Sequence, residues 1–546
     1  MKSRILVLSL AVLIALSLIA VGCPRPVEVV EPPVVEPVQP PPEVAVRGDT
    51  LIMGMVSPMV LNPVLFTDVP SGVIIGTIFS GLLKVNDKLE FEPDLAKSWE
   101  IEFLDDGRMV VTFHLRQDVL WHDGAPFTAE DVLFTFETIM DPHTITIRRG
   151  DYEKVEKWEV VDRHTFRVTF VEPFAPVMEA FSMGIIPKHL LEGEDVNIAP
   201  FNHAPVGTGP FVFREWIADV HVIVDRNENY FGQVPYLDSI VWRVIPDADV
   251  RIMELEAGTI DLTGIPTVHY HRMLGVDRIY VHRYPALSFN YFGWNERLPK
   301  FDDDRVRKAL TLALDREVMA EVIYEGLAIP ASSSFPPISW ASNPAVRPLP
   351  YDPEWAARLL KEAGWADTDG DGWLDRDGVK FEFEFLGLAG DPVAMMIIEL
   401  ALEHYKAIGV KLNPLFLEWG DFVSRLDPPR RAFEAFFLGF SVGVDPDPHI
   451  YYHSGQAEWG FNDTNFVDAR VDELIEAGRR EMDFERRRDI MWELHERLNE
   501  LQPVSFMFHV EALLGICRRF HGTVPSPVGA LWNVEYWWVP EDLQRY

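Results

Sequence analysis

Trp99-Glu-Ile-Glu-Phe103, Asp105-Asp-Gly107 and Met109-Val-Val-Thr-Phe-His-Leu115 decide the fold class of this chain, because a helical pattern follows them closely. Apolar and polar side chains roughly alternate in the first and last of these segments, and Asp-Asp-Gly is typical of a tight turn, so the sequence predicts a β-hairpin. Thr128 is a suitable N-cap for a helix over 129–139. Strands and a helix therefore share one short region.

The same mixture continues along the chain. From Asp303 to Tyr324 apolar residues recur at three- and four-residue steps, which predicts a helix, whereas Phe381-Glu-Phe-Glu-Phe385 alternates as a strand does. Further elements are expected as helices at 353–363, 392–408, 467–480 and 484–501 and as a strand at 504–510. Interspersed strands and helices predict an α/β fold with mixed sheets.

The N-terminus has the layout of a secretory signal. Lys2 and Arg4 precede an apolar run from Ile5 to Val21, and Ala20-Val21-Gly22-Cys23 resembles a lipobox. We therefore expect a signal peptide over 1–22 and lipidation of Cys23. The alternative is an uncleaved transmembrane anchor, since the run is nearly long enough to span a bilayer. In both cases the rest of the chain faces the outside of the membrane.

Residues 23–47 are expected to form the lipidated cysteine and a tether. The stretch from Pro24 to Glu43 mixes proline with valine and glutamate and contains no glycine, which favours extended polyproline geometry. Such a spacer would hold the folded part away from the membrane.

Composition limits the possible partners. The chain of 546 residues has 85 acidic and 49 basic side chains, a net charge of -36, which argues against nucleic-acid binding and against contact with anionic lipid headgroups. Membrane association is therefore expected through the anchor only. If Cys23 is lipidated, Cys517 is the remaining cysteine, and one thiol cannot form an intramolecular disulfide.

Several short segments, taken in order, resemble the oligopeptide-, dipeptide- and nickel-binding family of solute-binding proteins that serve ABC importers. They cover nearly all of the chain after residue 48. The segments are Leu95-Ala-Lys-Ser-Trp99, Asp106-Gly107, Thr112-Phe-His-Leu-Arg116, Trp121-His-Asp-Gly124, Phe127-Thr-Ala-Glu-Asp-Val132, Gly207-Thr-Gly-Pro-Phe211, Asp304-Arg-Val-Arg-Lys-Ala-Leu310, Ala313-Leu-Asp-Arg316, Ala363-Gly-Trp365 and Asp445-Pro-Asp-Pro448.

The resemblance implies a bilobed, periplasmic-binding-protein-like α/β fold with an extra domain inserted in the first lobe. Lobe I is expected at 48–90, 200–290 and 505–546, the inserted domain at 91–199, and lobe II at 291–504. Two such lobes would close over a ligand, with strands between them acting as the hinge.

The function that the resemblance implies is capture of a small solute, most simply a short peptide, and its delivery to an ABC permease. We expect a monomer in the cell envelope, on the extracytoplasmic face of the membrane, with no enzymatic activity and no cofactor apart from the calcium considered below. An oligosaccharide and nickel remain alternative solutes. A secreted hydrolase and a non-transport receptor are alternatives from other classes, although the sequence has no His-Glu-x-x-His, Gly-x-Ser-x-Gly or Walker motif.

Asp445 is the first candidate ligand residue. In peptide-binding relatives, the acid at the start of this segment pairs with the terminal amine of the ligand. Here an aromatic residue does not follow it, because the segment reads Asp445-Pro-Asp-Pro448. A structural turn is the alternative for Asp445. For Asp447 we prefer a role as helix cap, with Pro448 in the first turn.

Four more residues are candidates for walls of the cleft: Phe289, Asn290 and Trp294 in one aromatic stretch, and Trp419. Aromatic rings provide apolar walls for peptide side chains and stacking faces for sugars. Packing in the core is the alternative for each ring.

Two sequence patterns suggest metal sites. Asp367-Thr-Asp-Gly-Asp-Gly372 has the carboxylates and the glycine of a calcium loop, but position twelve is Gly378, so Asp375 or Asp377 would have to complete the set of Asp367, Asp369 and Asp371. An acidic turn that binds nothing is the alternative. His449 and His453 would share one helix face, without an evident third ligand, so ordinary histidines are favoured there.

Overall fold

The computed structural model describes residues 45–428, 430–458, 460–524 and 526–546. The predicted signal peptide, Cys23 and nearly all of the predicted tether lie outside these residues. Residues 41–546 form one compact unit. No helix within the described ranges is both long enough and apolar enough to cross a membrane.

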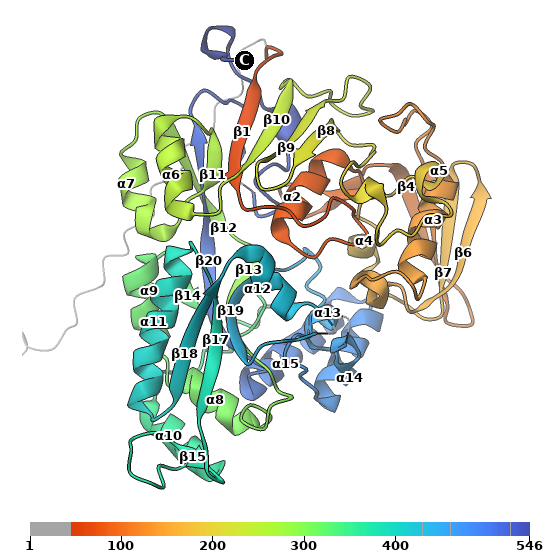
Figure 1. The fold of residues 1–546 in the computed structure, drawn as a ribbon. Helices are drawn as coiled ribbons and strands as arrows, with labels where there is room; N and C mark the ends of the chain where they lie inside the picture. Colours follow the sequence, from red (N-terminus) through yellow and green to blue (C-terminus); the bar gives the residue numbers. More distant parts are fainter. Residues whose placement is uncertain (1–44, 429, 459, 525) are drawn as a thin grey trace, which may run out of the picture. The chain divides into compact units, whose positions relative to one another are not determined.

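The predicted hairpin is confirmed and belongs to a four-stranded antiparallel sheet, in the order β4-β5-β7-β6. Phe103 pairs with Met109 next to the turn. Helix α3 begins at Thr128, whose backbone N–H donates to Asp131 at 2.9 Å, and it packs beside this sheet (Figure 1). The elements are β4 (Ala96–Phe103), β5 (Met109–Leu115), α3 (Ala129–Met140), β6 (Val155–Asp162) and β7 (Thr165–Phe170).

A second sheet contains twelve strands of the described part of the chain. Its first half, as we call it, consists of β1 (Thr50–Met55), β8 (Phe211–Ile217), β9 (His221–Arg226), β10 (Ser239–Val244), β11 (Leu262–Gly264) and β12 (Ile279–Pro285). Its second half consists of β13 (Ser288–Trp294), β14 (Ala328–Pro330), β17 (Glu382–Leu388), β18 (Lys411–Leu417) and β19 (Ala435–Ser441). Parallel and antiparallel pairs occur in both halves, as the mixed-sheet prediction requires.

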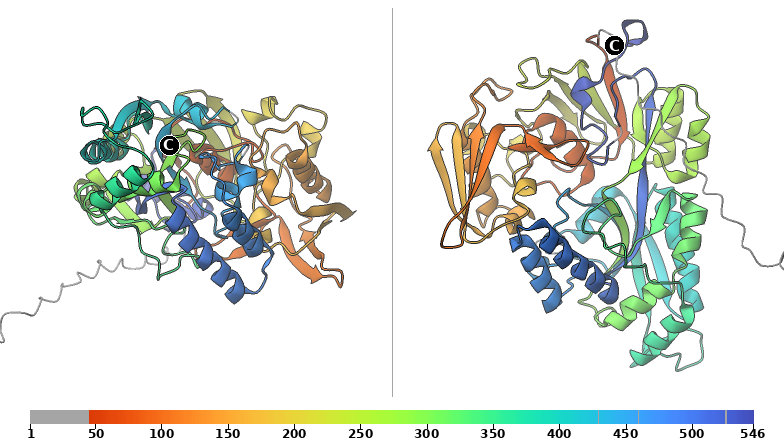
Figure 2. Two further views of the ribbon diagram at one scale, coloured as in Figure 1. Left: turned by 90° about the horizontal axis from the view of Figure 1, so that it is seen from below. Right: turned by 180° about the vertical axis from the view of Figure 1, so that it is seen from behind.

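Strand β20 (Val504–Cys517) joins the two halves of this sheet. It pairs with β13 and β14 as far as Val510 and with β12 and β11 from Glu511 onward, and it runs as one long strand between them (Figure 2). The chain crosses a second time between Pro285 and Ser288. Of the predicted lobe boundaries, 290/291 lies within β13 and 504/505 lies at the start of β20. The predicted division into lobes stays a prediction.

Helices flank the strands, and one predicted helix proves to be two. The run from Asp303 to Tyr324 breaks at Ala313, and Asp315 caps the second helix by accepting from the N–H of Val318 at 3.1 Å. The helices are α2 (Val69–Ile78), α4 (Val177–Ala180), α5 (Lys188–Leu191), α6 (Ala248–Ala257), α7 (Tyr270–Leu274), α8 (Asp304–Leu312), α9 (Arg316–Tyr324), α10 (Pro353–Glu362), α11 (Pro392–Ala407), α12 (Trp419–Leu426), α13 (His449–Tyr452), α14 (Ala469–Arg480) and α15 (Phe484–Leu501).

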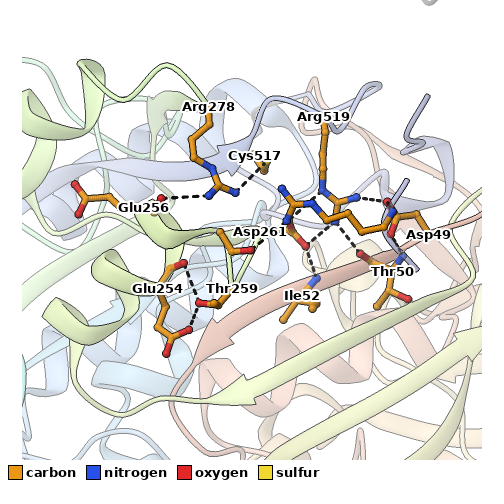
Figure 3. A network of polar contacts seen from close by, with 12 residues as sticks. Asp49, Thr50, Ile52, Glu254, Glu256, Thr259, Asp261, Arg278, Cys517 and Arg519 are labelled. Atoms are coloured by element: carbon orange, nitrogen blue, oxygen red, sulfur yellow. Dashed lines mark hydrogen bonds and ion pairs between the residues drawn. The ribbon is translucent and has the colours of Figure 1, made fainter. Parts of the chain in front are cut away.

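A buried ionic network connects strands of the first half of the sheet with the end of β20 (Figure 3). Arg519, just after β20, donates to both oxygens of Asp261 at 3.2 and 2.9 Å and to Asp49. Asp261 also accepts from the backbone N–H of Ile52 in β1. The network therefore connects β1, β11 and β20, whose residues are more than 200 positions apart in sequence. Burial raises the pKa of Asp261, and the Arg519 guanidinium opposes that rise.

Candidate solute-binding site

A cavity of about 520 Å³ is lined by helix α2, by loops that precede and follow strands of the first half of the sheet, and by one residue of the second half. Helix α2, the loop after it and the C-terminal segment 528–535 supply most of its wall, and Ser441 at the end of β19 contributes from the second half. The walls mix apolar side chains such as Val73 and Leu531 with polar ones such as Tyr230. A concave site of this size and mixed lining suits a small solute.

Helix α2 is positioned by its N-cap. Asp68 accepts from the backbone N–H of Ser71 at 2.9 Å and from its hydroxyl at 2.7 Å, and Pro70 lies in the first turn. Gly72 and Gly76 are four residues apart and both line the cavity. A Cβ at Gly76 would meet nothing within 4 Å, so the helix backbone is open to the cavity there. Bare backbone of this kind allows close approach of a ligand.

Three charged side chains line the cavity in the described part of the chain: Lys84 in β2 (Leu83–Val85), Asp94 after β3 (Phe91–Pro93) and Glu535 in the 3₁₀ helix Val534–Tyr536. Asp94 is 9% exposed. Burial raises its pKa to about 7, with Lys84 opposing the rise and Glu535 adding to it. Burial also raises the pKa of Glu535. The charged residues of the cavity lining are therefore two carboxyl groups with raised pKa values and one lysine.

Asp445 lies outside this cavity lining and has a partner of its own. Both of its carboxylate oxygens accept from Arg487 at 2.7 Å, and the Arg487 guanidinium lies 5.1 Å from the ring centre of Trp340. Its side chain is 11% exposed. A contact between Asp445 and a ligand amine would have to displace or share Arg487, so that role stays a prediction. Asp447 accepts from the N–H of His449 at 3.1 Å and pairs with Arg479 at 3.0 Å, but Pro448 and not Asp447 stands at the N-cap of α13, so the predicted capping position is one residue too early.

The Asp445 loop contacts the region of the four-stranded sheet. The backbone N–H of Asp445 donates to Glu179 in α4 at 3.2 Å, and burial together with the charges of Asp445 and Asp151 raises the pKa of Glu179 to about 7. Nearby, Arg479 of α14 donates to the carbonyl of Gly150 at 2.9 Å. These contacts were not predicted. Glu179 and Arg479 have no local sequence signal, because their partners lie more than 260 residues away.

The predicted aromatic residues are divided between two places. Trp294 is fully buried, donates its indole N–H to Ser505 at 3.1 Å and packs with Phe301. It is a core residue in this structure, which gives no support to its predicted role as a wall of the cleft. Phe289 is buried among aromatic rings and lines a small cavity of about 10 Å³. Its neighbours there include Tyr291, Phe440, Tyr451, Tyr452 and Phe461.

The other two predicted wall residues are partly exposed. Trp419 stacks on Phe422, with ring centres 6.3 Å apart, and its indole N–H has no hydrogen-bond partner among the described residues. Asn290 in β13 lies across from Gly439 of β19. Neither residue lines the 520 Å³ cavity, so their contact with a solute stays a prediction.

The acidic loop places three of its four predicted ligands near one another. One ligand atom each of Asp367, Asp369 and Asp375 lies within 4.8 Å of the others. The Lys380 ammonium occupies the same position, at 2.8 Å from Asp369 and 2.9 Å from Asp371. Calcium binding therefore stays a prediction, and it requires Lys380 to withdraw.

The histidine pair gains a third potential ligand. His449 and His453 stack with ring centres 4.6 Å apart, and Glu476 of α14 brings a carboxylate within 4.8 Å of both. Lys154 already pairs with Glu476 at 3.4 Å. A positive charge beside the carboxylate, and stacked rings, favour ordinary histidines over a metal site.

Comparisons with known proteins agree with this architecture. The family description "Bacterial extracellular solute-binding proteins, family 5 Middle" matches residues 90–462. Oligopeptide-binding protein AppA of Bacillus subtilis is 31% identical over 502 residues, which are 90% of this chain and 92% of AppA. The dipeptide-binding protein of Escherichia coli is 26% identical over 87% of this chain and 91% of its own length.

Solved structures of solute-binding proteins also match this chain. AppA of Bacillus subtilis with a nonapeptide matches with a TM-score of 0.88 at 30% identity, covering 91% of this chain and all of that one. NikZ of Campylobacter jejuni with Ni(L-His) matches with a TM-score of 0.82 at 28% identity, covering 90% and 99%. DppA of Helicobacter pylori with the peptide STSA has a TM-score of 0.81 at 26% identity, covering 90% and 98%.

These matches confirm the bilobed α/β fold and the resemblance that the short segments indicated. The assignment of the two halves of the large sheet to the two lobes stays a prediction. The chain belongs to family 5 of the bacterial extracellular solute-binding proteins, which serve ABC importers.

Proposed function

We propose that this protein captures short peptides between its two lobes and delivers them to an ABC permease. The observation that carries the proposal is the 520 Å³ cavity, whose lining joins α2 and segment 528–535 with Ser441 at the end of β19. A ligand in such a cavity contacts both lobes, so its binding energy favours the closed arrangement. The peptide complexes of AppA and of the Helicobacter pylori DppA support peptides as the solute class.

Native mass spectrometry tests this proposal. The folded body, residues 45–546, would be unfolded and refolded to remove bound solutes and then mixed with an equimolar library of random nonapeptides. We expect retention of peptides with unchanged masses, since the proposal includes no bond making or breaking. Selective retention of Ni(L-His) or of an oligosaccharide in parallel samples, with no peptide retained, would contradict the proposal. A shortened peptide would instead indicate a hydrolase.

We further propose that the protein acts as a monomer held to the outer face of the membrane by a lipid on Cys23. The lipobox-like segment and the proline-rich tether support the anchor. Cys23→Ser should move the protein from the membrane fraction to the soluble extracytoplasmic fraction. Retention of the variant in the membrane, with the N-terminal run still attached by mass, would indicate an uncleaved anchor.

A further inference from the structure

Asp94 lacks the partners that several other buried carboxylates of the described residues have. Glu179, whose pKa is also raised to about 7, accepts from the backbone N–H of Asp445 at 3.2 Å. Asp49 and Asp261 share Arg519, Asp445 pairs with Arg487, and Asp68 accepts two hydrogen bonds from Ser71. Asp94 has no cation within ion-pair distance in the described part of the chain. The hydroxyl of Ser80, Lys84 and Arg116 are the groups that favour its charged form.

The backbone of Asp94 is held by a hydrogen bond, and the residue lines the cavity. Its backbone N–H donates to the carbonyl of Leu82 at 3.2 Å, and the next residue, Leu95, is fully buried. The side chain lines the cavity together with Tyr230 and Glu535. A buried carboxylate without a cationic partner is unfavourable for the free protein, and burial raises the pKa of Asp94 to about 7.

The surroundings favour a positively charged guest. Two carboxylates line the cavity against one lysine, and Lys84 is exposed to solvent. An incoming ammonium or guanidinium would supply the partner that Asp94 lacks and would be shielded from water by the apolar wall. Tyr230 adds a hydroxyl and an aromatic face to the same wall.

We propose that Asp94, assisted by Glu535, binds a protonated amine or guanidinium of the captured peptide in the 520 Å³ cavity. This inference rests on the proposed peptide-binding function and specifies a subsite within it. The cation can come from the N-terminus of the peptide or from a lysine or arginine side chain, and the experiment separates these two sources.

Isothermal titration calorimetry with three synthetic nonapeptides tests the subsite. The neutral probe contains alanine, serine and glycine and is acetylated and amidated. The second probe has one central lysine, and the third is the neutral probe with a free N-terminus. At pH 8 we expect one of the cationic probes to bind at least tenfold more tightly than the neutral probe. The preferred probe identifies the source of the cation.

Asp94→Asn should remove most of this preference, and Glu535→Gln should reduce it by a smaller factor. Asp87→Asn is the matched control, because it makes the same change at an exposed position of the β2–β3 turn. For the wild type, the preference should fall from pH 8 to pH 6. Below about pH 7 Asp94 must release a proton before it can pair with the cation.

The possible results distinguish failure of the Asp94 subsite from failure of the proposed peptide capture. Equal affinities of the wild type for all probes, or a preference that survives in Asp94→Asn, would overturn the subsite while leaving peptide capture intact. If the wild type bound neither the probes nor any library peptide, the proposed function itself would fail, and the subsite with it. If Asp94→Asn did not fold, Glu535→Gln and the pH dependence of the wild type would still test the proposed subsite.

Discussion

Two sets of buried carboxylates show opposite arrangements. Around β1, β11 and β20, Asp49 and Asp261 surround Arg519, and every charge has a partner. At the cavity wall, Asp94 is nearly as buried but has no cationic partner. Paired charges hold distant strands together, whereas an unpaired carboxylate in a cavity is unfavourable until a ligand arrives. Buried carboxylates with a cationic partner therefore stabilise the fold, whereas we propose that the carboxylate without one binds the solute.

The largest effect on stability is expected in the ionic network of Arg519, Asp49 and Asp261. Arg519→Met should lower the free energy of unfolding by about 3–5 kcal/mol, because it leaves Asp49 and Asp261 buried without a cation. Urea denaturation measures this change. Arg214→Met is the control, since the Arg214–Asp225 pair is largely exposed and should contribute about 0–1 kcal/mol. Similar losses in both variants would contradict the structural role of the buried network.

Asp445→Asn should have the next largest effect on stability, about 1–3 kcal/mol, because Arg487 loses its bidentate partner. Since Arg487 already holds both carboxylate oxygens, we expect peptides with free and acetylated N-termini to lose affinity equally. A selective loss for the free amine would assign the amine contact to Asp445 and would weaken the argument for Asp94.

Asp94→Asn should stabilise the ligand-free protein by about 1–3 kcal/mol at pH 8. The pKa of Asp94 in the folded protein is raised to about 7. The contribution of this carboxyl to stability is therefore present below the unfolded value near 4 and is lost as pH rises through about 7. The variant lacks this loss, so its advantage in melting temperature should grow between pH 4 and pH 7. An advantage that is constant with pH would contradict the unpaired carboxylate.

The smallest effect is expected at the acidic loop. Because Lys380 already neutralises Asp369 and Asp371, removing calcium with a chelator should change the melting temperature by less than about 1 °C. Lys380→Met removes the competing ammonium and should make the loop more responsive to added calcium. A clear fall in the melting temperature of the wild type with chelator would establish the calcium site.

Local patterns in the sequence predicted most of the architecture. The hairpin around residue 106, the helix capped by Thr128 and the alternating strand near Phe383 depend on neighbouring residues, so they could be recognised without a structure. The break between α8 and α9 was missed, because the apolar periodicity continues across it while Asp315 starts a new helix.

The site was predicted less well, because its residues come together only in the folded chain. Asp94 lies next to a recognised segment at 95–99, but nothing local indicates that it meets Glu535 in a cavity. Trp294 was predicted as a wall of the cleft because it lies in an aromatic stretch, but its side chain is buried in the core. The sequence around Asp445 could not show that Arg487 holds its carboxylate.

The most direct test of peptide capture is a crystal structure of residues 45–546 with the nonapeptide probe that binds most tightly. We expect a peptide between α2, segment 528–535 and Ser441, with an ammonium or guanidinium nitrogen about 3 Å from the Asp94 carboxylate. A peptide bound at another surface, or a cation held by Asp445 with Asp94 left unpaired, would contradict it.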